Sequence, residues 1–265
     1  MIIVIVLHLF RLNRMQRINV SVLWLALSLV VRRLEGVCEK PGKFSFHTEK
    51  LHYCDAHELC LKEGQAVGRL GTMVGQCVDK YLEQNTMLSS TWINLHALHS
   101  HTSDASESSW IYGDTGRSRS APEMIHQQIN ETEGDLDGHR VAIITKQNII
   151  VRRGTKSDKH SVLCQIVALP NNHKNRFVEK FVQASLPTGD SWLKEKKWSG
   201  GCFSIYVRST KIMCAMRCHV DLKCRSFYHN FIDDQCITSN YVDSLLGDKY
   251  GQKRRLGWIK FPRPG

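Results

Sequence analysis

Ten cysteines in a chain of 265 residues constrain its fold more than any other feature of the sequence. The first five are widely spaced and the last five lie close together: Cys38, Cys54, Cys60, Cys77 and Cys164, then Cys202, Cys214, Cys218, Cys224 and Cys236. So many cysteines indicate metal sites in a cytosolic protein and disulfides in a secreted one. Which of the two applies depends on whether the N-terminus carries a secretion signal.

The N-terminus has the pattern of a secretion signal. Three arginines precede Val20–Val31, a twelve-residue run without charge. A membrane-spanning helix needs about 20 apolar residues, so this run is short for an anchor. We expect a signal peptide over residues 1–36, translated from Met1 or Met15, with an uncleaved anchor as the alternative. The mature protein is then secreted and extracellular, has no stable membrane anchor, and uses its cysteines in disulfides.

Turn-forming residues separate the two cysteine groups and divide the mature chain into domains. We expect a first domain over residues 37–169, a connector over 170–196 and a second domain over 197–265. Within the connector, Phe177 and Phe181 recur at helical spacing and favour a short helix that continues to Val182.

The first domain has the pattern of two helices followed by several strands, which indicates an α+β fold. Apolar residues at helical spacing predict a helix over 51–61, ended by Gly64, and a second helix over 73–83. Runs rich in Trp, Val and Ile predict the strands, over 92–95, 109–112, 140–151 (a hairpin) and 161–167.

Four segments in this order resemble a C-type lectin-like domain: Tyr53–Cys60, Trp92-Ile93-Asn94, Ser109-Trp110 and Val162–Gln165. The resemblance implies an α+β domain with two helices, mixed antiparallel sheets and a long loop. It also implies a Cys60–Cys164 disulfide between the first helix and the last strand.

The sequence departs from that family where calcium would bind. The family's sugar sites hold calcium through a Glu-Pro-Asn or Gln-Pro-Asp triplet and a Trp-Asn-Asp triplet, whose oxygen atoms suit a hard cation. This chain has Ala121-Pro122-Glu123 and Asn148-Ile149-Ile150 instead, and isoleucine offers no ligand. We therefore expect no metal and no cofactor, although calcium is the one to test for, and we expect the loop Ala97–Gly138 to be mobile.

The second cysteine group resembles a PAN/apple domain. Cys214 and Cys218 are one helical turn apart, Cys224 opens a strand that contains Ser226-Phe227-Tyr228, and Cys236 follows. The resemblance implies a helix packed on an antiparallel sheet, with Cys214–Cys236 and Cys218–Cys224 disulfides. Trp258–Phe261 is expected to supply the last strand.

These pairs leave four cysteines without an assigned partner: Cys38, Cys54, Cys77 and Cys202. One hypothesis is that one of the first three bonds to Cys202 and links the two domains. The alternative is that one unpaired cysteine from each domain bridges to another chain.

Several motifs have simpler explanations than catalysis or metal binding. Asp114-Thr115-Gly116 occurs once, whereas an aspartic protease needs two carboxylates. We interpret His96, His99 and His101 as part of a solvated loop rather than a zinc site. No nucleophile–base pair is evident, so an enzyme is not expected. Asn130-Glu131-Thr132 is an acceptor for glycosylation at Asn130.

The formal net charge is +11, and it becomes +7 without residues 1–36, which contain five Arg and one Glu. Part of this charge is clustered, and such clusters either attract polyanions or form solvated faces. The residues considered for polyanion binding are Arg152, Arg153, Lys156, Lys159, Lys253, Arg254 and Arg255.

The sequence thus predicts a secreted recognition or adhesion protein that binds extracellular glycans or proteins. One alternative is a modulator of another protein, such as a receptor or protease antagonist. Another is a binder of heparin or other sulfated polysaccharides. Nucleic acid is not expected as a partner outside the cell.

Overall fold

The computed structural model describes residues 42–86, 89–98, 110–113, 140–147, 150–153, 158–168, 179–184, 200–246 and 257–263. They all belong to one compact unit, Pro41–Gly265, and form two β-sheets with three helices. The predicted signal peptide and most of the predicted long loop lie outside the described residues. Among the described residues, no helix has the length and apolar character needed to cross a membrane.

The first sheet contains seven strands, and its path runs in the order β1-β7-β3-β5-β6, with β2 beside β7 and β4 beside β3. All its pairs are antiparallel except β3 with β7. The strands are β1 (Lys43–Leu51), β2 (Leu70–Met73), β3 (Thr91–His96), β4 (Ile111–Tyr112), β5 (Val141–Ile144), β6 (Ile150–Arg153) and β7 (His160–Val167).

Both faces of the central strands are buried. Because successive side chains of a strand point to opposite faces, Trp92 and Ile93 enter two different core clusters. Ile143 and Ile144 divide between the same two clusters. Burial on both faces explains why β5 is a continuous apolar run, Val-Ala-Ile-Ile, instead of an alternation of apolar and polar residues.

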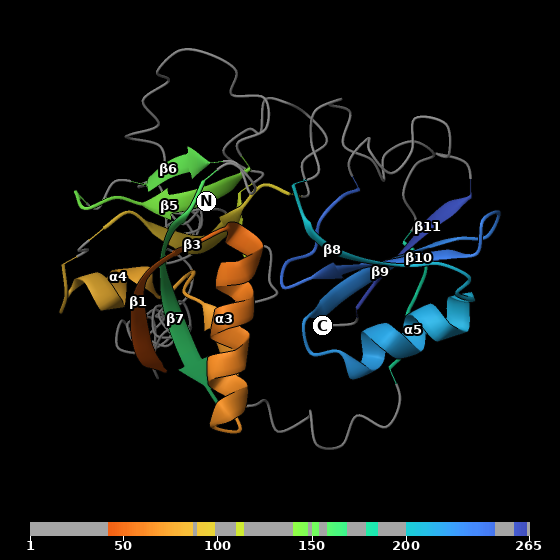
Figure 1. Ribbon diagram of the computed structural model, residues 1–265, viewed down its shortest axis with the longest axis horizontal. Coiled ribbons are helices and arrows are strands. Elements are labelled where there is room, and N and C mark those ends of the chain that lie inside the picture. The colour runs from red at the N-terminus through yellow and green to blue at the C-terminus, as the bar shows by residue number, and fades with distance from the viewer. Residues whose placement is uncertain are drawn as a thin grey trace, which may run out of the picture. The chain divides into compact units, whose positions relative to one another are not determined.

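Two helices accompany this sheet, α3 (Tyr53–Ala66) and α4 (Val78–Leu82) (Figure 1). The prediction that Gly64 ends the first helix was wrong, because α3 continues to Ala66. A Cβ at Gly64 would lie 2.1 Å from the backbone nitrogen of Gly71, so this glycine permits close approach of α3 to β2. The second helix starts later than predicted, because Met73 is paired with Cys164 of β7.

The second sheet has the order β11-β9-β10-β8 and is antiparallel throughout. Helix α5 packs across β9 and β10, and its first turn is capped by the Thr210 hydroxyl, which accepts from the Met213 nitrogen at 3.2 Å (Figure 1). The elements are β8 (Cys202–Tyr206), α5 (Lys211–Val220), β9 (Cys224–Asn230), β10 (Gln235–Asn240) and β11 (Trp258–Pro262).

The short helix predicted for the connector is absent from the part that the structure describes, residues 179–184. The Ala184 nitrogen donates to the carbonyl oxygen of Lys260 in β11 at 2.9 Å. Phe181 packs edge-on against Phe227, with ring centroids 5.2 Å apart. Contacts with the second sheet therefore determine this segment's conformation, and its helical spacing does not.

Candidate functional site

Disulfides tie the described elements together, and one of them joins the two sheets. Four have both cysteines among the described residues: Cys60–Cys164, Cys214–Cys236, Cys218–Cys224 and Cys54–Cys202. The first three are the pairs that the two resemblances imply. The fourth links α3 to β8, so Cys202 has its partner within the chain. Cys77 is also disulfide-bonded, and Cys38 lies outside the described residues.

Aromatic stacking continues the junction between the two sheets beside that disulfide. The ring of Tyr241, just after β10, stacks on the ring of His57 in α3, with centroids 5.1 Å apart and planes 7° apart. Tyr53 meets the same imidazole edge-on at 4.7 Å. The Leu245 nitrogen donates to the carbonyl oxygen of Leu98 at 3.0 Å, which adds a backbone link.

A charged cluster borders the stacked rings. The Tyr241 hydroxyl donates to one carboxylate oxygen of Glu58, and Lys223 Nζ lies 3.9 Å from the same oxygen. The other oxygen of Glu58 lies 3.4 Å from Lys62 Nζ. The hydrogen bond from Tyr241, helped by these two cations, lowers the pKa of Glu58. Burial, together with that ionised carboxylate, raises the pKa of Tyr241. The hydroxyl therefore keeps its proton and donates to an anion.

His57 is neutral in this environment. Burial, and then the positive charge of Arg225, lowers its pKa to about 3. A general base works best with a pKa near the working pH, so this imidazole is poorly suited to proton transfer. The position of the His57 ring between the rings of Tyr53 and Tyr241 indicates that it serves packing.

A small cavity lies at the same junction, lined in part by His57, Asn94 and Tyr241. It has room for about one water molecule. The His57 Nε2 and Asn94 Oδ1 atoms are buried and have no hydrogen-bond partner. A cavity of this size cannot hold a sugar ring, so the junction connects the two sheets rather than enclosing a ligand.

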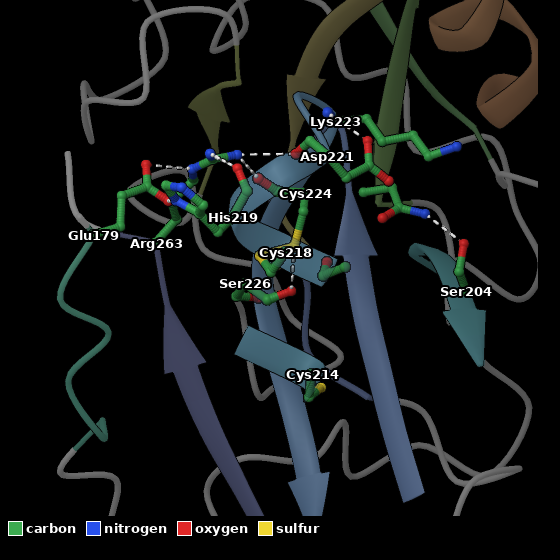
Figure 2. Close-up of a disulfide and its surroundings, with 12 residues drawn as sticks. Glu179, Ser204, Cys214, Cys218, His219, Asp221, Lys223, Cys224, Ser226 and Arg263 are labelled. Atoms are coloured by element: carbon green, nitrogen blue, oxygen red, sulfur yellow. Dashed lines mark hydrogen bonds and ion pairs between the residues drawn. A yellow bond between two sulfur atoms is a disulfide. The ribbon is translucent and has the colours of Figure 1, made fainter. Parts of the chain in front are cut away.

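A second polar cluster fixes α5 at its C-terminus (Figure 2). Arg263, which follows β11, donates to the carbonyl oxygens of His219, Asp221 and Cys224 at 2.9 to 3.1 Å. Its Nε also donates to Glu179 at 3.0 Å, and the other oxygen of that carboxylate is 3.1 Å from His219 Nδ1. The guanidinium thereby joins the carbonyl end of α5 to the first residue of β9.

Most of the predicted basic residues lie outside the described part of the chain. Arg152 and Arg153 lie in β6, and of their side chains nothing is described; Lys159 is exposed just before β7. The remaining predicted positions lie outside the described residues, namely Lys156, Lys253, Arg254, Arg255, the acceptor Asn130 and the triplet around Pro122.

The interpretation of His96 as a loop residue was wrong. His96 is buried within β3, where its Nδ1 accepts from the Leu98 nitrogen at 3.4 Å. Its apolar neighbours in the sequence are also buried, which explains why a histidine at this position belongs to the core. His99 and His101 lie outside the described residues.

One group with metal-ligand chemistry occurs among the described residues, His47 with Glu63 and Cys164. The sulfur of Cys164 is bonded to Cys60, so it cannot act as a thiolate ligand. The other two side chains form an ion pair, with His47 Nε2 2.9 Å from a Glu63 oxygen. This group therefore does not suit zinc, which prefers thiolate and imidazole ligands in a closed site.

The principal members of both polar clusters were not among the residues predicted from the sequence. The i, i+4 spacing of Tyr53 and His57 on one helix face could have indicated that His57 is buried. The Tyr241–Glu58 pair spans 183 residues, and no local pattern marks such a contact. The partners of Arg263 also lie far from it in the sequence, so no local pattern indicated its role.

No family model matches the chain, and no curated protein matches its sequence. Among solved structures, the C-type lectin CEL-I from Cucumaria echinata is similar, with a TM-score of 0.35 and 10% identity, over 49% of this chain and 94% of its own. An EPNH mutant of CEL-I gives the same score over 93% of its own chain. TC14, a C-type lectin from the tunicate Polyandrocarpa misakiensis, is 16% identical at a TM-score of 0.35, over 48% of this chain and 98% of its own.

Proposed function

We propose that this protein is a secreted recognition or adhesion protein that binds carbohydrate or protein ligands without a calcium-dependent sugar site of the usual lectin type. The observation that carries the proposal is the junction, in which the Cys54–Cys202 disulfide and the His57–Tyr241 stack join two sheets into one body. A body fixed in this way presents its surface preorganised, which lowers the entropic cost of binding.

The proposal assigns a C-type lectin-like domain to residues 37–169 and a PAN/apple-like domain to 197–265, with a connector between them and a signal peptide at 1–36. Five disulfide-bonded cysteines of the second group and four of the first support an oxidising, extracellular compartment. Glycosylation at Asn130 is part of the same proposal.

The polar chemistry of the junction supports a binding role rather than an enzymatic one. His57 is neutral and packed between rings, and Glu58 is held by a hydroxyl and two cations. Each of these groups is used to hold a neighbouring part of the protein. This is the opposite of a catalytic pair, in which a base is kept free to accept a proton.

Binding of the mature protein to a glycan array, with and without EDTA, tests the proposal. We expect any sugar binding to persist in EDTA, because the sequence replaces the family's calcium ligands with Ala121 and Ile149. Sugar binding that disappears in EDTA would overturn the calcium-independent assignment. Absence of binding to both the array and a panel of extracellular proteins would overturn the recognition function.

A sulfated polysaccharide is a second candidate ligand, favoured by the net charge of +7 that remains without residues 1–36. Heparin affinity chromatography tests it, because attraction between exposed charges is screened by salt. We expect elution at moderate salt and earlier elution of a variant with Lys253, Arg254 and Arg255 changed to alanine. A matched variant at Lys43, Lys50 and Lys62 controls for the loss of net charge, and equal elution of the two variants would reject a localised site.

A further inference from the structure

The outward face of α5 is apolar, which is unusual for a helix surface in contact with water. Its exposed apolar side chains are Ile212 (69% exposed), Met213 (43%), Met216 (62%) and Val220 (75%). At 3.6 residues per turn these four positions fall within an arc of about 100°. They therefore form one continuous stripe, which we call the α5 stripe.

The α5 stripe cannot turn inward. Cys214 and Cys218 project from the opposite side of the helix and are buried, and their disulfides bind them to β10 and to the start of β9. Arg263 holds the carbonyl end of the helix, as Figure 2 shows. The helix is thus fixed with the stripe facing out, which makes the stripe a permanent feature of the surface.

Positive charge borders the α5 stripe. The helix contains no Asp or Glu, and Arg217, which follows Met216, is exposed beside the stripe. Lys211 is exposed too, but it lies on the side of the helix that faces the sheet, with its Nζ over the Phe261 ring. The Arg217 guanidinium is held over the Tyr206 ring, 4.3 Å from its centroid. Asp221, the residue that ends the helix, is half-buried, and its carboxylate accepts from the Lys223 nitrogen at 3.1 Å. Glu179, near the same turn, has a side chain that is 2% exposed and is engaged by Arg263 and His219.

The exposed carboxylates Asp233 and Asp234 lie in the β9–β10 turn and not on the helix. A partner that covers the stripe would therefore meet the Arg217 guanidinium beside it on the helix. Two copies of α5 facing each other would bring Arg217 close to the same residue of the second copy, which like-charge repulsion opposes. Charge complementarity favours a partner whose apolar surface is bordered by carboxylates.

The composition of the stripe favours a protein partner over a lipid surface. Methionine and arginine are enriched in protein interfaces, and exposed methionine adapts to partners of differing shape. Helices that lie on membranes usually present Trp, Phe or Leu, and the α5 stripe has none of these. We propose that the α5 stripe is the docking site for an acidic amphipathic helix of a partner protein. This inference rests on the proposed recognition function and specifies its partner class.

A synthetic peptide tests the inference with the full mature protein. The probe is a labelled acidic helix of about 18 residues with leucines along one face and glutamates beside them. Its controls are a scrambled peptide of the same composition and a version with lysine in place of glutamate. Fluorescence anisotropy should show binding of the acidic amphipathic peptide alone, and this binding should weaken as salt is added.

The matched protein variants are Met216→Glu on the stripe and Val67→Glu, an equally exposed apolar residue after α3. We expect Met216→Glu to weaken peptide binding at least about tenfold, which is typical of a central interface residue, and Val67→Glu to leave it unchanged. Both side chains are exposed, so unchanged near-UV circular dichroism should show that both variants fold.

Four outcomes would overturn the inference: no binding of the acidic amphipathic peptide, equal binding of the scrambled peptide, unchanged binding by Met216→Glu, or equal loss in Val67→Glu.

Binding of wild-type protein to phosphatidylserine–phosphatidylcholine vesicles that is lost in Met216→Glu would assign the stripe to a lipid surface. A dimer that dissociates in Met216→Glu would assign it to a second copy. A glycan or protein ligand that binds Met216→Glu normally would overturn the α5 docking site and leave the recognition function intact.

Discussion

The stability of the junction between the sheets depends on pH through the protonation of His57. This residue lies between Tyr53 and Tyr241, and its pKa is lowered to about 3 by burial and by Arg225. The unfolded chain would bind a proton near pH 6.5, the ordinary value for histidine, whereas the folded protein would not. Stability is therefore lost as the pH falls through this range.

We predict that His57→Gln removes part of this acid sensitivity. As the pH falls from about 6.5 to about 4.5, the wild-type protein should lose about 2 kcal/mol more unfolding free energy than the variant. His57→Phe, which keeps a ring against Tyr241, should show the same reduced dependence. Urea unfolding across this range measures the effect, which precedes the titration of Glu58 at lower pH. Parallel pH profiles of wild type and both variants would contradict the prediction.

Residue-scale features were the hardest to predict from the sequence. The cysteine spacing pointed to disulfides because cysteines pair with one another, which leaves few possibilities. His96 and Tyr241 gave no comparable signal, because a histidine or tyrosine can be buried or exposed and its partners lie far away in the chain. Local sequence cannot specify contacts that the tertiary fold creates.

Secondary-structure elements were predicted more successfully than their boundaries. Strands β3 and β7 occur where runs rich in Trp, Val and Ile indicated them, and helix α5 occurs where the cysteine spacing did. The end of α3 was misplaced because Gly64 was interpreted as the residue that ends the helix. The lack of a side chain at Gly64 instead permits close contact between α3 and Gly71. Glycine has both uses, and the sequence alone does not distinguish them.

Gly64 and Gly68 allow the two uses of glycine to be separated. Gly64→Ala should lower the unfolding free energy by about 3 kcal/mol, because the added Cβ would overlap the backbone of Gly71. Gly68 has open space around it but a φ of +66°, so Gly68→Ala should cost only about 1 kcal/mol through backbone strain. Denaturant unfolding of both variants measures the difference. Equal losses, or a larger loss at Gly68, would refute the close-approach explanation.

The cap on α5 makes a second prediction for a single element. Arg263→Ala should lower the unfolding free energy by about 3 kcal/mol, because it exposes three carbonyl groups and leaves the buried Glu179 without its guanidinium partner. Arg263→Lys should recover only part of the loss, since an ammonium group lacks the planar set of donors. Arg69→Ala, at an exposed arginine, is the control. Full stability of Arg263→Lys would show that charge alone is sufficient.

At the scale of the whole molecule, cysteine pairing determines how the two sheets become one body. All nine cysteines in the part of the chain that the structure describes are disulfide-bonded. An odd number of cysteines in each group indicated either a disulfide between the groups or bridges to another chain, and it left the first-domain cysteine open among three. Only the structure selects Cys54, whose place on α3 lies opposite the start of β8, with the two Cα atoms 5.6 Å apart.

The Cys54–Cys202 disulfide should make the two sheets unfold together. We predict that replacing both cysteines with alanine lowers the unfolding free energy by about 2–4 kcal/mol and splits one calorimetric transition into two, because the remaining junction contacts are non-covalent. Replacing Cys218 and Cys224 with alanine is the matched control, since that disulfide lies within the second sheet and its helix. The control should weaken the second sheet without uncoupling the first. A single transition in the Cys54–Cys202 variant would mean that the His57–Tyr241 stack and the surrounding contacts suffice to hold the sheets together.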